Sequence, residues 1–424
     1  MGAPLDLCIY GLGYIGLPTA VVCAEAGLHV HGVEISETKR ACLAEGSSPI
    51  EEPGLQEALT ACLQTGRLKV SAQPTQAAVH LVAVPTPFQA GGRGDPQPDL
   101  SYVLAAGDAI ATVARPHDLV ILESTSPPGA TEKLAKHLQG LGCDQLLYAY
   151  CPERVLPGHI LRELVENDRV VGGLSPEATE RAVEFYRHFV SGEVLATTAR
   201  TAEYVKLAEN TFRDINIAYA NELAMICERD PVDVAEVITL ANRHPRVQIL
   251  NPGIGVGGHC ISVDPWFLVS SAPQQAEVIR QARRRNDGTP VHLAKRLAAL
   301  MKARGFSQAA LLGVAYKPDV DDDRESPAWH FATALTKLEI NVAVADPLFV
   351  DHPHLVSTQA ALAQAEVIIV GAGHSVFKAL EPEHVAGWTQ ARLVFDPTAS
   401  LDHQRWSEAG FHILKVGNQT GWDV

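Results

Sequence analysis

One cysteine in the middle of the chain follows directly on a glycine-rich stretch. Residues 251–259 contain four glycines, Cys260 comes next, and Asp264 lies four residues further on. Glycine lets the backbone approach a ligand closely, so this run predicts a loop whose amides wrap a substrate and present the thiol. If the chain is helical from Ile261 onward, the thiol and the carboxylate share one face, and the helix amides favour the thiolate. A buried, inert cysteine is the alternative interpretation.

A reactive thiol at this position suits the oxidation of an aldehyde to an acid. An aldehyde carbon must become tetrahedral before it can lose a hydride. Cys260 would therefore add to it as a thiohemiacetal, and hydride loss would leave a thioester for water to hydrolyse. Lys206 would stabilise the oxyanion or shuttle the first proton, and Asp264 with Glu153 would direct water. Because a free thiol has a pKa of about 8.5, a cation or helix amides must populate the thiolate, and Lys206 is the candidate named for that task.

Lys206 belongs to a long helix that is predicted from Thr201 to about Glu228. Thr201 is the expected N-cap, and Glu203 is favourable in the first turn. Apolar residues leave little of the helix surface polar, which predicts a helix buried in the middle of the molecule. A helix of this length is also a natural link between domains and a dimer contact.

A polar stripe runs along this helix. Its members recur at spacings close to helical ones and share a face: Lys206, Asn210, Arg213 and Asn221. On a helix this apolar, Lys and Arg side chains need a buried anion, carboxylate or substrate to offset their desolvation. The three arginines at 283–285 are instead predicted to form a solvated helix face.

The chain begins with the pattern of a dinucleotide-binding fold. A strand is predicted over Leu5 to Tyr10, a helix over Leu17 to Ala26 and a second strand over His29 to Val33. Between the first strand and the helix stand the cofactor-binding glycines Gly11, Gly13 and Gly16. Glu34 ends the second strand, where a ribose diol would be gripped, and its charge repels a 2′-phosphate, so NAD is favoured over NADP. Lys39 is counted with the cofactor-binding residues.

Further strands are predicted at 79–84, 119–123 and 145–150. Ligands meet an open parallel sheet at the carboxyl ends of its strands, and this rule selects the loops that follow. Thr86 and Thr125 are candidates for hydroxyl contacts with the cofactor, and Glu153 could handle water or a proton. Arg154 could pair with an anion. Ordinary turn or helix-cap roles are the alternative for each of these residues.

A second α/β region begins at Ala309. Strands are predicted at 310–315, 341–345 and 367–370 and a helix at 327–338, without a glycine triplet. A nucleotide fold that lacks the pyrophosphate turn suggests a different nucleotide, with Lys317 or Arg324 available for phosphate. The pair His352 and His354 is interpreted as loop, and no metal site is expected.

Composition bounds the class of protein. The 424 residues are enough for two or three domains, and 46% hydrophobic with 20% charged residues is ordinary for a soluble globular chain. The net charge of −15 argues against nonspecific binding to nucleic acid or anionic membranes. The eight cysteines show neither a Cys-x-x-Cys pair nor zinc spacing. A cytoplasmic enzyme with reduced thiols is therefore expected.

Seven motifs distributed along nearly the whole chain resemble the UDP-glucose/GDP-mannose dehydrogenase family. They are Gly-Leu-Gly-Tyr-Ile-Gly-Leu-Pro at 11–18, Val-Pro-Thr-Pro at 84–87, Glu-Ser-Thr-Ser-Pro at 123–127, Cys-Pro-Glu-Arg at 151–154, Lys-Leu-Ala-Glu-Asn at 206–210, Gly-Val-Gly-Gly-His-Cys at 255–260 and Tyr-Lys-Pro at 316–318. Within the family, residues 242–247 and 258–266 look most like the members that act on UDP-N-acetyl-D-mannosamine.

The resemblance implies roles for individual residues. Cys260 would be the nucleophile and Lys206 the catalytic lysine, with Asp264, Glu153, Asn210 and Thr125 in the catalytic group. The implied substrate contacts are Arg154, Val155, Lys206, Asn210, Arg213, His244, Arg246, Gly257, Tyr316 and Lys317. The implied NAD contacts beyond the glycine turn are Tyr14, Ile15, Glu34, Thr86, Thr125 and Arg324. Family members usually form a dimer through the central helix, which would bring His244 and Arg246 to the neighbouring subunit's site.

The expected fold is α/β, with two Rossmann-like doubly wound parallel-sheet domains joined by a long central helix. The expected domains are an NAD-binding domain at 1–198, a helical domain with the catalytic loop and dimer contact at 199–297, and a UDP-binding domain at 298–424. The expected reaction is the four-electron oxidation of UDP-N-acetyl-D-mannosamine to its uronate for polysaccharide biosynthesis, with two NAD per substrate.

Three alternatives remain open. The same enzyme could act on UDP-N-acetylglucosamine or UDP-glucose; a 2- or 3-hydroxyacid dehydrogenase would use one NAD and no thiol; and a silent nucleotide sensor would show no turnover. Three positions depart from the family pattern. Glu34 replaces the usual Asp, Tyr316 replaces the usual Phe, and Ile254 stands where close relatives have Pro.

Overall fold

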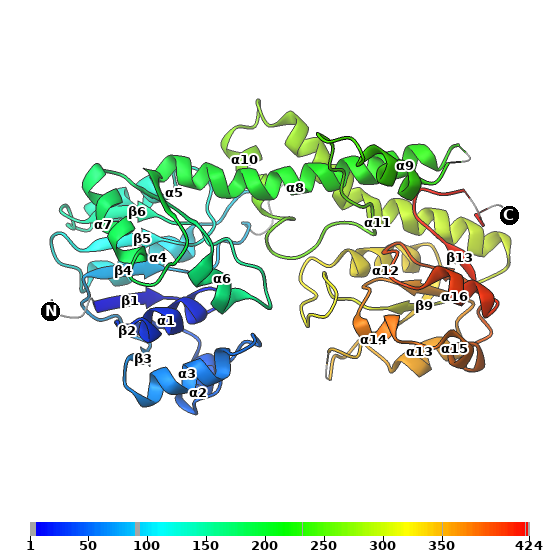
Figure 1. Cartoon of the computed structure of the whole chain (residues 1–424), viewed down its shortest axis with the longest axis horizontal. Helices are drawn as coiled ribbons and strands as arrows, with labels where there is room; N and C mark the ends of the chain where they lie inside the picture. The colour runs from blue at the N-terminus through cyan, green and yellow to red at the C-terminus, as the bar shows by residue number, and fades with distance from the viewer. Residues whose placement is uncertain (1–5, 90–93, 231, 350, 420, 423–424) are drawn as a thin grey trace. The chain divides into compact units, whose positions relative to one another are not determined.

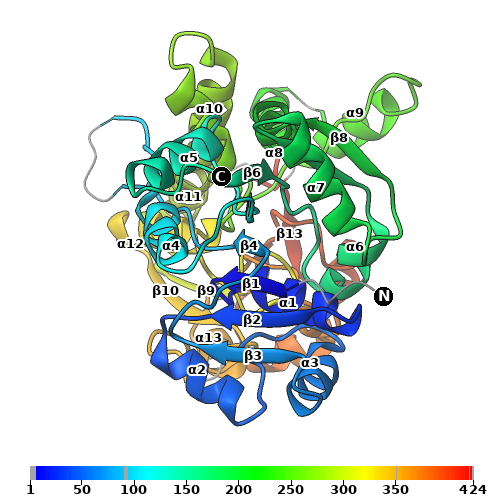
Figure 2. The same cartoon turned by 90° about the vertical axis from the view of Figure 1, so that its left-hand side faces the viewer.

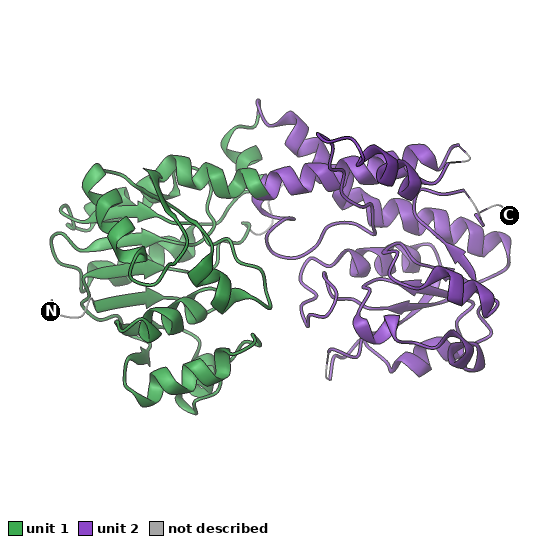
Figure 3. Cartoon of the chain, in the orientation of Figure 1, with its two compact units in different colours: residues 1–209, 266–273 green, residues 210–265, 274–424 purple. Residues whose placement is uncertain are grey.

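The chain forms two compact units. The computed structural model describes residues 6–89, 94–230, 232–349, 351–419 and 421–422. One unit comprises residues 1–209 with 266–273, and the other comprises 210–265 with 274–424 (Figure 3). The predicted three-part division, with boundaries after 198 and 297, remains a proposal.

The first unit is built on a twisted eight-stranded sheet. Its strands are β1 (Asp6–Tyr10), β2 (His29–Val33), β3 (Leu68–Ser71), β4 (Val79–Val82), β5 (Leu119–Leu122), β6 (Leu147–Tyr150), β7 (Arg169–Gly173) and β8 (Val194–Thr198). They lie in the order β3-β2-β1-β4-β5-β6-β7-β8 (Figure 2). Every neighbouring pair is parallel except β6 and β7, which run antiparallel. The order reverses between β1 and β4, which is where a doubly wound sheet receives its ligand.

Helices cover both faces of this sheet. The helices of the first unit are α1 (Gly16–Glu25), α2 (Glu37–Ala44), α3 (Leu55–Gln64), α4 (Ser101–Ala111), α5 (Ala130–Gly140), α6 (Ile160–Glu166) and α7 (Pro176–Tyr186). Leu7 and Ile9 of β1 pack in one core with α1, α3, α6 and α7. The alternate residues Cys8 and Tyr10 pack in a second core with α4 and α5. This two-sided burial follows from the period of two along a strand and explains why β1 is apolar from Leu7 to Tyr10.

A single helix of 29 residues, α8 (Ala199–Cys227), runs through the middle of the chain (Figure 1). It begins two residues before the predicted N-cap Thr201, because the hydroxyl of Thr198 accepts the amide of Thr201 at 3.2 Å and caps the helix instead. The prediction of a helix buried on all sides is wrong. Phe212 is 69% exposed, and Tyr219 and Ile226 are each 54% exposed.

The second unit has a five-stranded, wholly parallel sheet in the order β10-β9-β11-β12-β13. These strands are β9 (Gln308–Leu312), β10 (Asn341–Ala345), β11 (Val367–Val370), β12 (Leu393–Phe395) and β13 (His412–Leu414). The remaining helices of the chain are α9 (Val234–Ala241), α10 (Asp264–Ser271), α11 (Glu277–Ala303), α12 (Pro327–Lys337), α13 (Thr358–Ala363), α14 (Ser375–Lys378), α15 (Pro382–Trp388) and α16 (His403–Glu408). Core residues of α11 and α12 pack on one face of this sheet, and core residues of α13, α14, α15 and α16 pack on the other.

The arginine run at 283–285 is a solvated face only in part, because Arg284 is exposed but Arg283 is buried. Arg283, on α11, is 1% exposed and forms an ion pair with the fully buried Asp214 of α8. Arg283 also pairs with Asp287. The prediction fails for Arg283 because α11 presents this side chain to a carboxylate of the neighbouring helix α8. Sequence spacing alone does not reveal that contact. Among the described residues, no helix has both the length and the apolar character that spanning a membrane requires.

Candidate functional site

The three glycines of the first turn each meet a different steric limit. A Cβ on Gly11, which has a φ of +91°, would lie 2.8 Å from the carbonyl oxygen of Ala83. A Cβ on Gly16 would lie 1.9 Å from the carbonyl oxygen of Gly11. A Cβ on Gly13 would meet nothing within 4 Å. Two glycines are therefore needed for the turn itself, and the third leaves open space in which a pyrophosphate could approach the backbone. These residues fit a dinucleotide.

Glu34 stands beside this turn at the end of β2. Its side chain is 6% exposed, and its two oxygens accept the amides of Leu12 at 3.1 Å and Ser36 at 2.8 Å. Arg40 does not neutralise this carboxylate, because its guanidinium donates to the main-chain oxygen of Glu34. Lys39 is exposed and lies in the first turns of α2. A fixed carboxylate next to the glycine turn suits a ribose diol and disfavours a ribose phosphate.

Two of the predicted cofactor loops touch each other. The hydroxyl of Thr86 donates to the main-chain oxygen of Thr125 at 2.6 Å. The hydroxyl of Ser124 donates to the main-chain oxygen of Val84 at 2.7 Å. The loops after β4 and β5 are thereby joined at the edge of the sheet where both strands end. Tyr14 and Ile15, the other predicted cofactor contacts, are half-buried in the turn before α1.

Glu153 belongs to a buried ion pair. It is 7% exposed, and Arg169, which is 2% exposed, lies 2.5 Å from it. Glu153 also accepts the amide of Arg154. A carboxylate held in this way fixes the position of the loop after β6. Its predicted work on water or a proton remains a prediction.

A second carboxyl group lies in the same pocket of the first unit and was not singled out from the sequence. Glu123 is 1% exposed and accepts the hydroxyls of Tyr186 at 3.1 Å and Thr19 at 3.4 Å. Burial raises the pKa of Glu123 to about 8, the charge of Glu153 adds to the rise, and Arg169 opposes it. Glu123 is therefore largely protonated at neutral pH. Its position inside Glu-Ser-Thr-Ser-Pro was the available signal, but sequence cannot reveal that two carboxyl groups share one cation.

The predicted substrate residues of the first unit lie on the loop after β6 and on α8. Arg154 pairs with Glu209 of α8, with its Nη2 at 2.6 Å from the carboxylate. Val155 is half-buried beside it. Lys206 is 9% exposed. A buried ammonium on an apolar helix supports a functional position, since burying a cation is unfavourable unless something pairs with it.

Cys260 lies at the start of a helical turn in the second unit. The amides of Val263 and Asp264 donate to the carbonyl oxygen of Cys260 at 3.0 and 2.8 Å. Residues 261–263 form turns and α10 begins at Asp264, so the predicted helical start at Ile261 is three residues too early. The four-residue spacing nevertheless closes one helical turn between the thiol and the carboxylate. Cys260 is half-buried, so the thiol is not fully buried as the alternative interpretation expected, and its reactivity stays a prediction.

Asp264 and Asn210, two members of the predicted catalytic group, are in contact. Asp264 is 2% exposed, and the side-chain amide of Asn210 donates to it at 2.5 Å. The side-chain amide of Asn210 thus holds the Asp264 carboxylate through one of its two oxygens. Lys206 and Glu153 belong to the first unit, and Cys260 and Asp264 belong to the second. Their joint action remains a prediction.

The glycine loop packs closely against protein, and the prediction that its amides wrap a substrate stays a prediction. A Cβ on Gly258 would lie 2.8 Å from the ring of Tyr316. A Cβ on Gly257 would lie 2.7 Å from the main-chain oxygen of Glu325, and one on Gly255 would lie 2.9 Å from Pro327. The run is glycine-rich because the loop passes close to the segment between β9 and α12. The predicted contact of Gly257 with substrate stays a prediction.

Three asparagines hold the chain that leads into this loop, and sequence reasoning gave none of them that role. Asn221 accepts the amide of Gly253 at 2.9 Å and donates to Asn286 at 3.0 Å. Asn216 accepts the amide of Leu250 at 3.0 Å and donates to the oxygen of Gln248. Asn242 also accepts the amide of Ile249 at 2.7 Å. The sequence pattern places Asn221 in the polar stripe of α8. Its side chain binds a backbone amide and another asparagine, and neither of these partners is an anion.

Arg324 lies close to the nucleophile loop. It forms two hydrogen bonds with Asp322, at 2.8 and 2.6 Å, and its main-chain oxygen accepts the amide of Gly258 at 3.1 Å. The hydrogen bonds to Asp322 raise the pKa of Arg324, with smaller contributions from Tyr316 and Cys260. Arg324 is therefore a cation within electrostatic reach of the thiol, a role for which only Lys206 was named from the sequence. Its predicted contact with NAD remains a prediction.

The other predicted substrate residues of the second unit fall into two groups. Tyr316 and Lys317 are half-buried on the loop after β9. Arg213, His244 and Arg246 are exposed. Their predicted contact with substrate stays a prediction. In the part of the chain that the structure describes, no cluster of His, Cys, Asp and Glu has the arrangement of a metal site.

Three family models match the chain in succession. They are the NAD binding domain of the UDP-glucose/GDP-mannose dehydrogenase family at 5–190, its central domain at 200–288 and its UDP binding domain at 310–403. The UDP-N-acetyl-D-mannosamine dehydrogenase of Methanococcus aeolicus is 41% identical over 424 residues, covering 99% of this chain and 96% of its own. The NDP-N-acetyl-D-galactosaminuronic acid dehydrogenase of Ralstonia nicotianae is 44% identical over 411 residues, covering 92% and 95%. The solved structure of a UDP-D-ManNAc dehydrogenase from Pyrococcus horikoshii is similar with a TM-score of 0.91 at 37% identity, covering 98% of this chain and 100% of that one.

Proposed function

The chain belongs to the UDP-glucose/GDP-mannose dehydrogenase family, and from this premise we propose that this NAD-dependent UDP-sugar dehydrogenase converts UDP-N-acetyl-D-mannosamine to UDP-N-acetyl-D-mannosaminuronate. The choice of sugar is supported by the relative from Methanococcus aeolicus, which is named for this substrate and matches almost the whole chain. The choice of chemistry rests on one observation. Cys260 opens a helical turn that ends at Asp264, a buried carboxylate held by Asn210.

The proposed reaction has two oxidations. The first takes the primary alcohol at C6 of the sugar to an aldehyde, and Lys206 receives or relays the hydroxyl proton. The Cys260 thiolate then adds to the aldehyde carbon and forms a carbon–sulfur bond. The resulting thiohemiacetal loses a hydride and becomes a thioester. Water adds to the thioester and releases the carboxylate and the thiol, directed by Asp264 and Glu153.

NAD, when bound, supplies a hydride acceptor, and two molecules are consumed because each oxidation removes two electrons. We propose that the glycine turn at 11–16 and Glu34 hold it, with contacts from Tyr14, Ile15, Lys39, Thr86, Thr125 and Arg324. The open space at Gly13 and the fixed carboxylate of Glu34 support this assignment.

The proposed substrate contacts comprise two sets. On the sugar side are Arg154, Val155, Lys206, Asn210, Arg213, His244, Arg246 and Gly257. On the nucleotide side are Tyr316 and Lys317, which lie within the matched UDP binding domain.

A substrate panel tests the sugar. NADH release is measured with UDP-N-acetylmannosamine, UDP-N-acetylglucosamine, UDP-glucose and UDP-N-acetylgalactosamine at equal concentrations. The proposal expects the highest kcat/KM with UDP-N-acetylmannosamine. A preference for one of the others would assign the chain to that sugar; the relative from Ralstonia nicotianae gives a reason to include the galactosamine epimer.

The stoichiometry and one thiol variant test the chemistry. Wild type should yield two NADH per sugar, and Cys260→Ala should lose full conversion to the uronate. Cys143→Ala is a matched control because Cys143 is also a half-buried free thiol. One NADH per substrate, with activity retained in Cys260→Ala, would favour a hydroxyacid dehydrogenase. Zero turnover with every UDP-sugar would favour a nucleotide sensor.

We also propose that the enzyme is a homodimer formed through α8. Phe212, Tyr219 and Ile226 recur every seven residues and are all more than half exposed, so they form an apolar stripe. Sedimentation should give a dimer for wild type and a monomer for Phe212→Glu. Val356→Glu is the control, because Val356 is a 47% exposed apolar residue off this helix. A monomeric wild type would contradict the proposal, as would a Phe212→Glu variant that still dimerises.

The proposed compartment is the cytoplasm. None of the eight cysteines, all of which lie within the described residues, forms a disulfide, and most of them are buried. Reduced thiols suit a reducing compartment. Activity that survives reductant and falls under mild oxidant would agree with this placement.

A further inference from the structure

A short loop of the second unit is held at both ends by one network of polar contacts, of which His374 and Asp346 are buried. The loop follows β9 and carries Tyr316 and Lys317. The sheet order reverses at β9, with β10 on one side and β11 on the other. In doubly wound sheets this reversal marks the ligand crevice. A Cβ on Gly313, which has a φ of +89°, would lie 2.6 Å from the main-chain oxygen of Ala372, so the loops after β9 and β11 are in close contact there.

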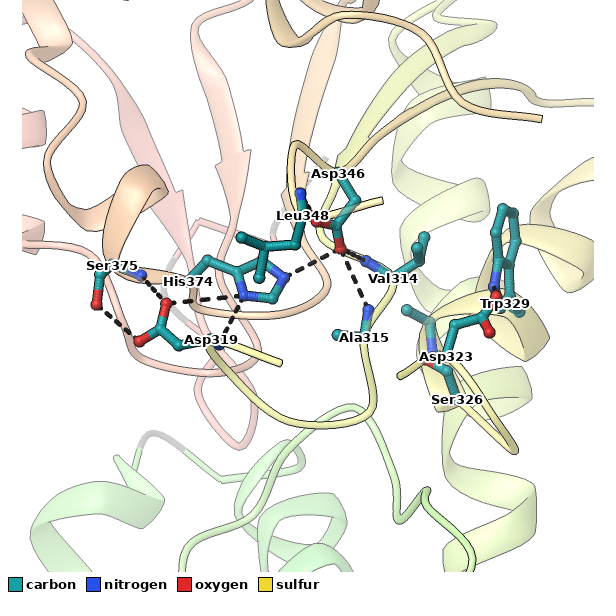
Figure 4. A network of polar contacts seen from close by, with 11 residues as sticks. Val314, Ala315, Asp319, Asp323, Ser326, Trp329, Asp346, Leu348, His374 and Ser375 are labelled. Carbon is teal, nitrogen blue, oxygen red and sulfur yellow. Dashed lines mark hydrogen bonds and ion pairs between the residues drawn. The ribbon is translucent and has the colours of Figure 1, made fainter. Parts of the chain in front are cut away.

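Asp346 holds the start of the loop. It follows β10, is 3% exposed, and one of its oxygens accepts the amides of Val314 at 2.8 Å and Ala315 at 3.3 Å (Figure 4). Burial alone would raise the pKa of Asp346, but hydrogen bonds from His374 and from backbone amides lower it below its ordinary value. The group is therefore a carboxylate. In the first unit the acidic residue at the equivalent place, Glu34, likewise accepts an amide of the loop after β1, that of Leu12 at 3.1 Å.

His374 holds the end of the loop. Its side chain is 0% exposed, its Nδ1 lies 2.8 Å from the amide nitrogen of Asp319, and its Nε2 lies 3.0 Å from the carboxylate of Asp346 (Figure 4). A backbone N–H can only donate, so Nδ1 must be the acceptor. The ring proton then belongs to Nε2 and is donated to Asp346. One neutral imidazole thus joins the two anchors.

Asp319 needs such an anchor. Its φ is +59°, in the left-handed region that a non-glycine residue adopts at a cost in energy. Its carboxylate accepts the amide and the hydroxyl of Ser375, each at 2.7 Å. These hydrogen bonds lower the pKa of Asp319. The network therefore runs without interruption from Ser375 through Asp319, His374 and Asp346 to the start of the loop.

We propose that His374 is a positioning residue for the nucleotide half of the substrate. Through Asp346 and Asp319 it fixes both ends of the segment 314–319, and the segment then presents Tyr316 and Lys317 to the uridine diphosphate. The inference rests on the proposed function, because it takes this loop as the nucleotide site. It assigns a binding role to a buried side chain that cannot itself reach a ligand.

Two isosteric variants separate the positioning role from mere filling of space. In His374→Asn the amide oxygen can take the place of Nδ1 and accept from Asp319. In His374→Gln the amide reaches the place of Nε2 and leaves the Asp319 amide without an acceptor. We expect the Kd for UDP and the KM for the UDP-sugar to rise roughly tenfold in His374→Gln and by less than about threefold in His374→Asn, the scale of one lost hydrogen bond. The values of kcat and of KM for NAD should stay near wild type.

His403→Gln is the matched control. His403 also donates to a buried aspartate of the same unit, with 2.9 Å between its Nε2 and Asp396, but it lies outside the network. Its UDP affinity should equal that of wild type. Should His374→Gln fail to fold, Ser375→Ala replaces it, with an expected rise in the UDP Kd of about threefold.

The outcomes distinguish the two levels of the proposal. Wild type that binds no UDP would overturn the nucleotide site and with it the proposed function. Wild type that binds UDP, together with a His374→Gln variant of unchanged Kd, would overturn only the role of His374. Equal losses in His374→Asn and His374→Gln would also overturn it, because a packing defect does not depend on which nitrogen is replaced.

Discussion

At the residue scale, the proposed cofactor turn contains one glycine that its backbone requires, Gly16, and one that it does not, Gly13. A methyl group on Gly13 would meet open space, whereas one on Gly16 would lie 1.9 Å from a backbone oxygen. We expect Gly13→Ala to keep the melting temperature within about 2 °C and to weaken NAD binding at least tenfold. Gly16→Ala should lower the melting temperature strongly. Calorimetry and NAD titration measure both effects, and a Gly13→Ala variant that binds NAD normally would remove the dinucleotide from this turn.

The buried carboxyl of Glu123 predicts how stability depends on pH. Burial raises its pKa to about 8 in the folded chain, while an unfolded glutamate has a pKa of about 4.3. Between these values the folded state holds a proton that the unfolded state has lost, so this group's contribution to stability falls as the pH rises through the window and is fully lost above pH 8. Glu123→Gln should flatten this slope and stabilise the protein at pH 8 relative to wild type.

Denaturant titrations at several pH values between 5 and 9 measure that slope. Glu180→Gln, on the surface pocket of α7 that Arg187 also lines, is a control in which the wild-type slope should persist. An unchanged slope in Glu123→Gln would mean that Glu123 is ionised in the folded protein.

At the scale of elements, α8 holds a neighbouring loop by a side-chain hydrogen bond. Asn221, which is 1% exposed, holds the loop before Cys260 by the amide of Gly253. Removing its side chain leaves the amide of Gly253 without its acceptor and the side-chain oxygen of Asn286 without its donor, so we expect Asn221→Ala to lower stability by about 1–3 kcal/mol. The value of kcat should fall with KM for NAD unchanged, because the thiol is displaced and the cofactor turn is not. Steady-state kinetics of Asn221→Ala are measured beside those of the exposed control Asn341→Ala. An unchanged kcat in Asn221→Ala would mean that the loop holds its position without this hydrogen bond.

At the scale of the whole molecule, each unit has its own sheet, its own two cores and its own predicted nucleotide. Ligands stabilise the parts that bind them. We expect NAD alone to slow hydrogen exchange in residues 7–34 and UDP alone to slow it in 313–319 and 371–375. Mass spectrometry of exchanged peptides measures this. Protection of 313–319 by NAD and not by UDP would reverse the assignment of the two sheets.

Much of this architecture is readable from sequence because it depends on local order. A strand, a glycine turn, a helix and a second strand with a terminal acid describe β1, α1 and β2 almost residue by residue, since each step is set by neighbours within thirty positions. The same holds for Cys260 and Asp264, whose four-residue spacing is one helical turn. The resemblance of seven short motifs then pointed to the family that the comparisons establish.

Only the tertiary structure determined which partners the charged and amide groups have. Arg283 meets Asp214, Glu123 shares a pocket with Glu153, Asn221 binds a backbone amide and His374 joins two aspartates. Each of these contacts joins residues between 28 and 69 positions apart. Hydrophobic periodicity specifies which face of an element is buried, but the free energy of a buried charge depends on the atoms within a few ångströms of it, and only the folded chain determines those.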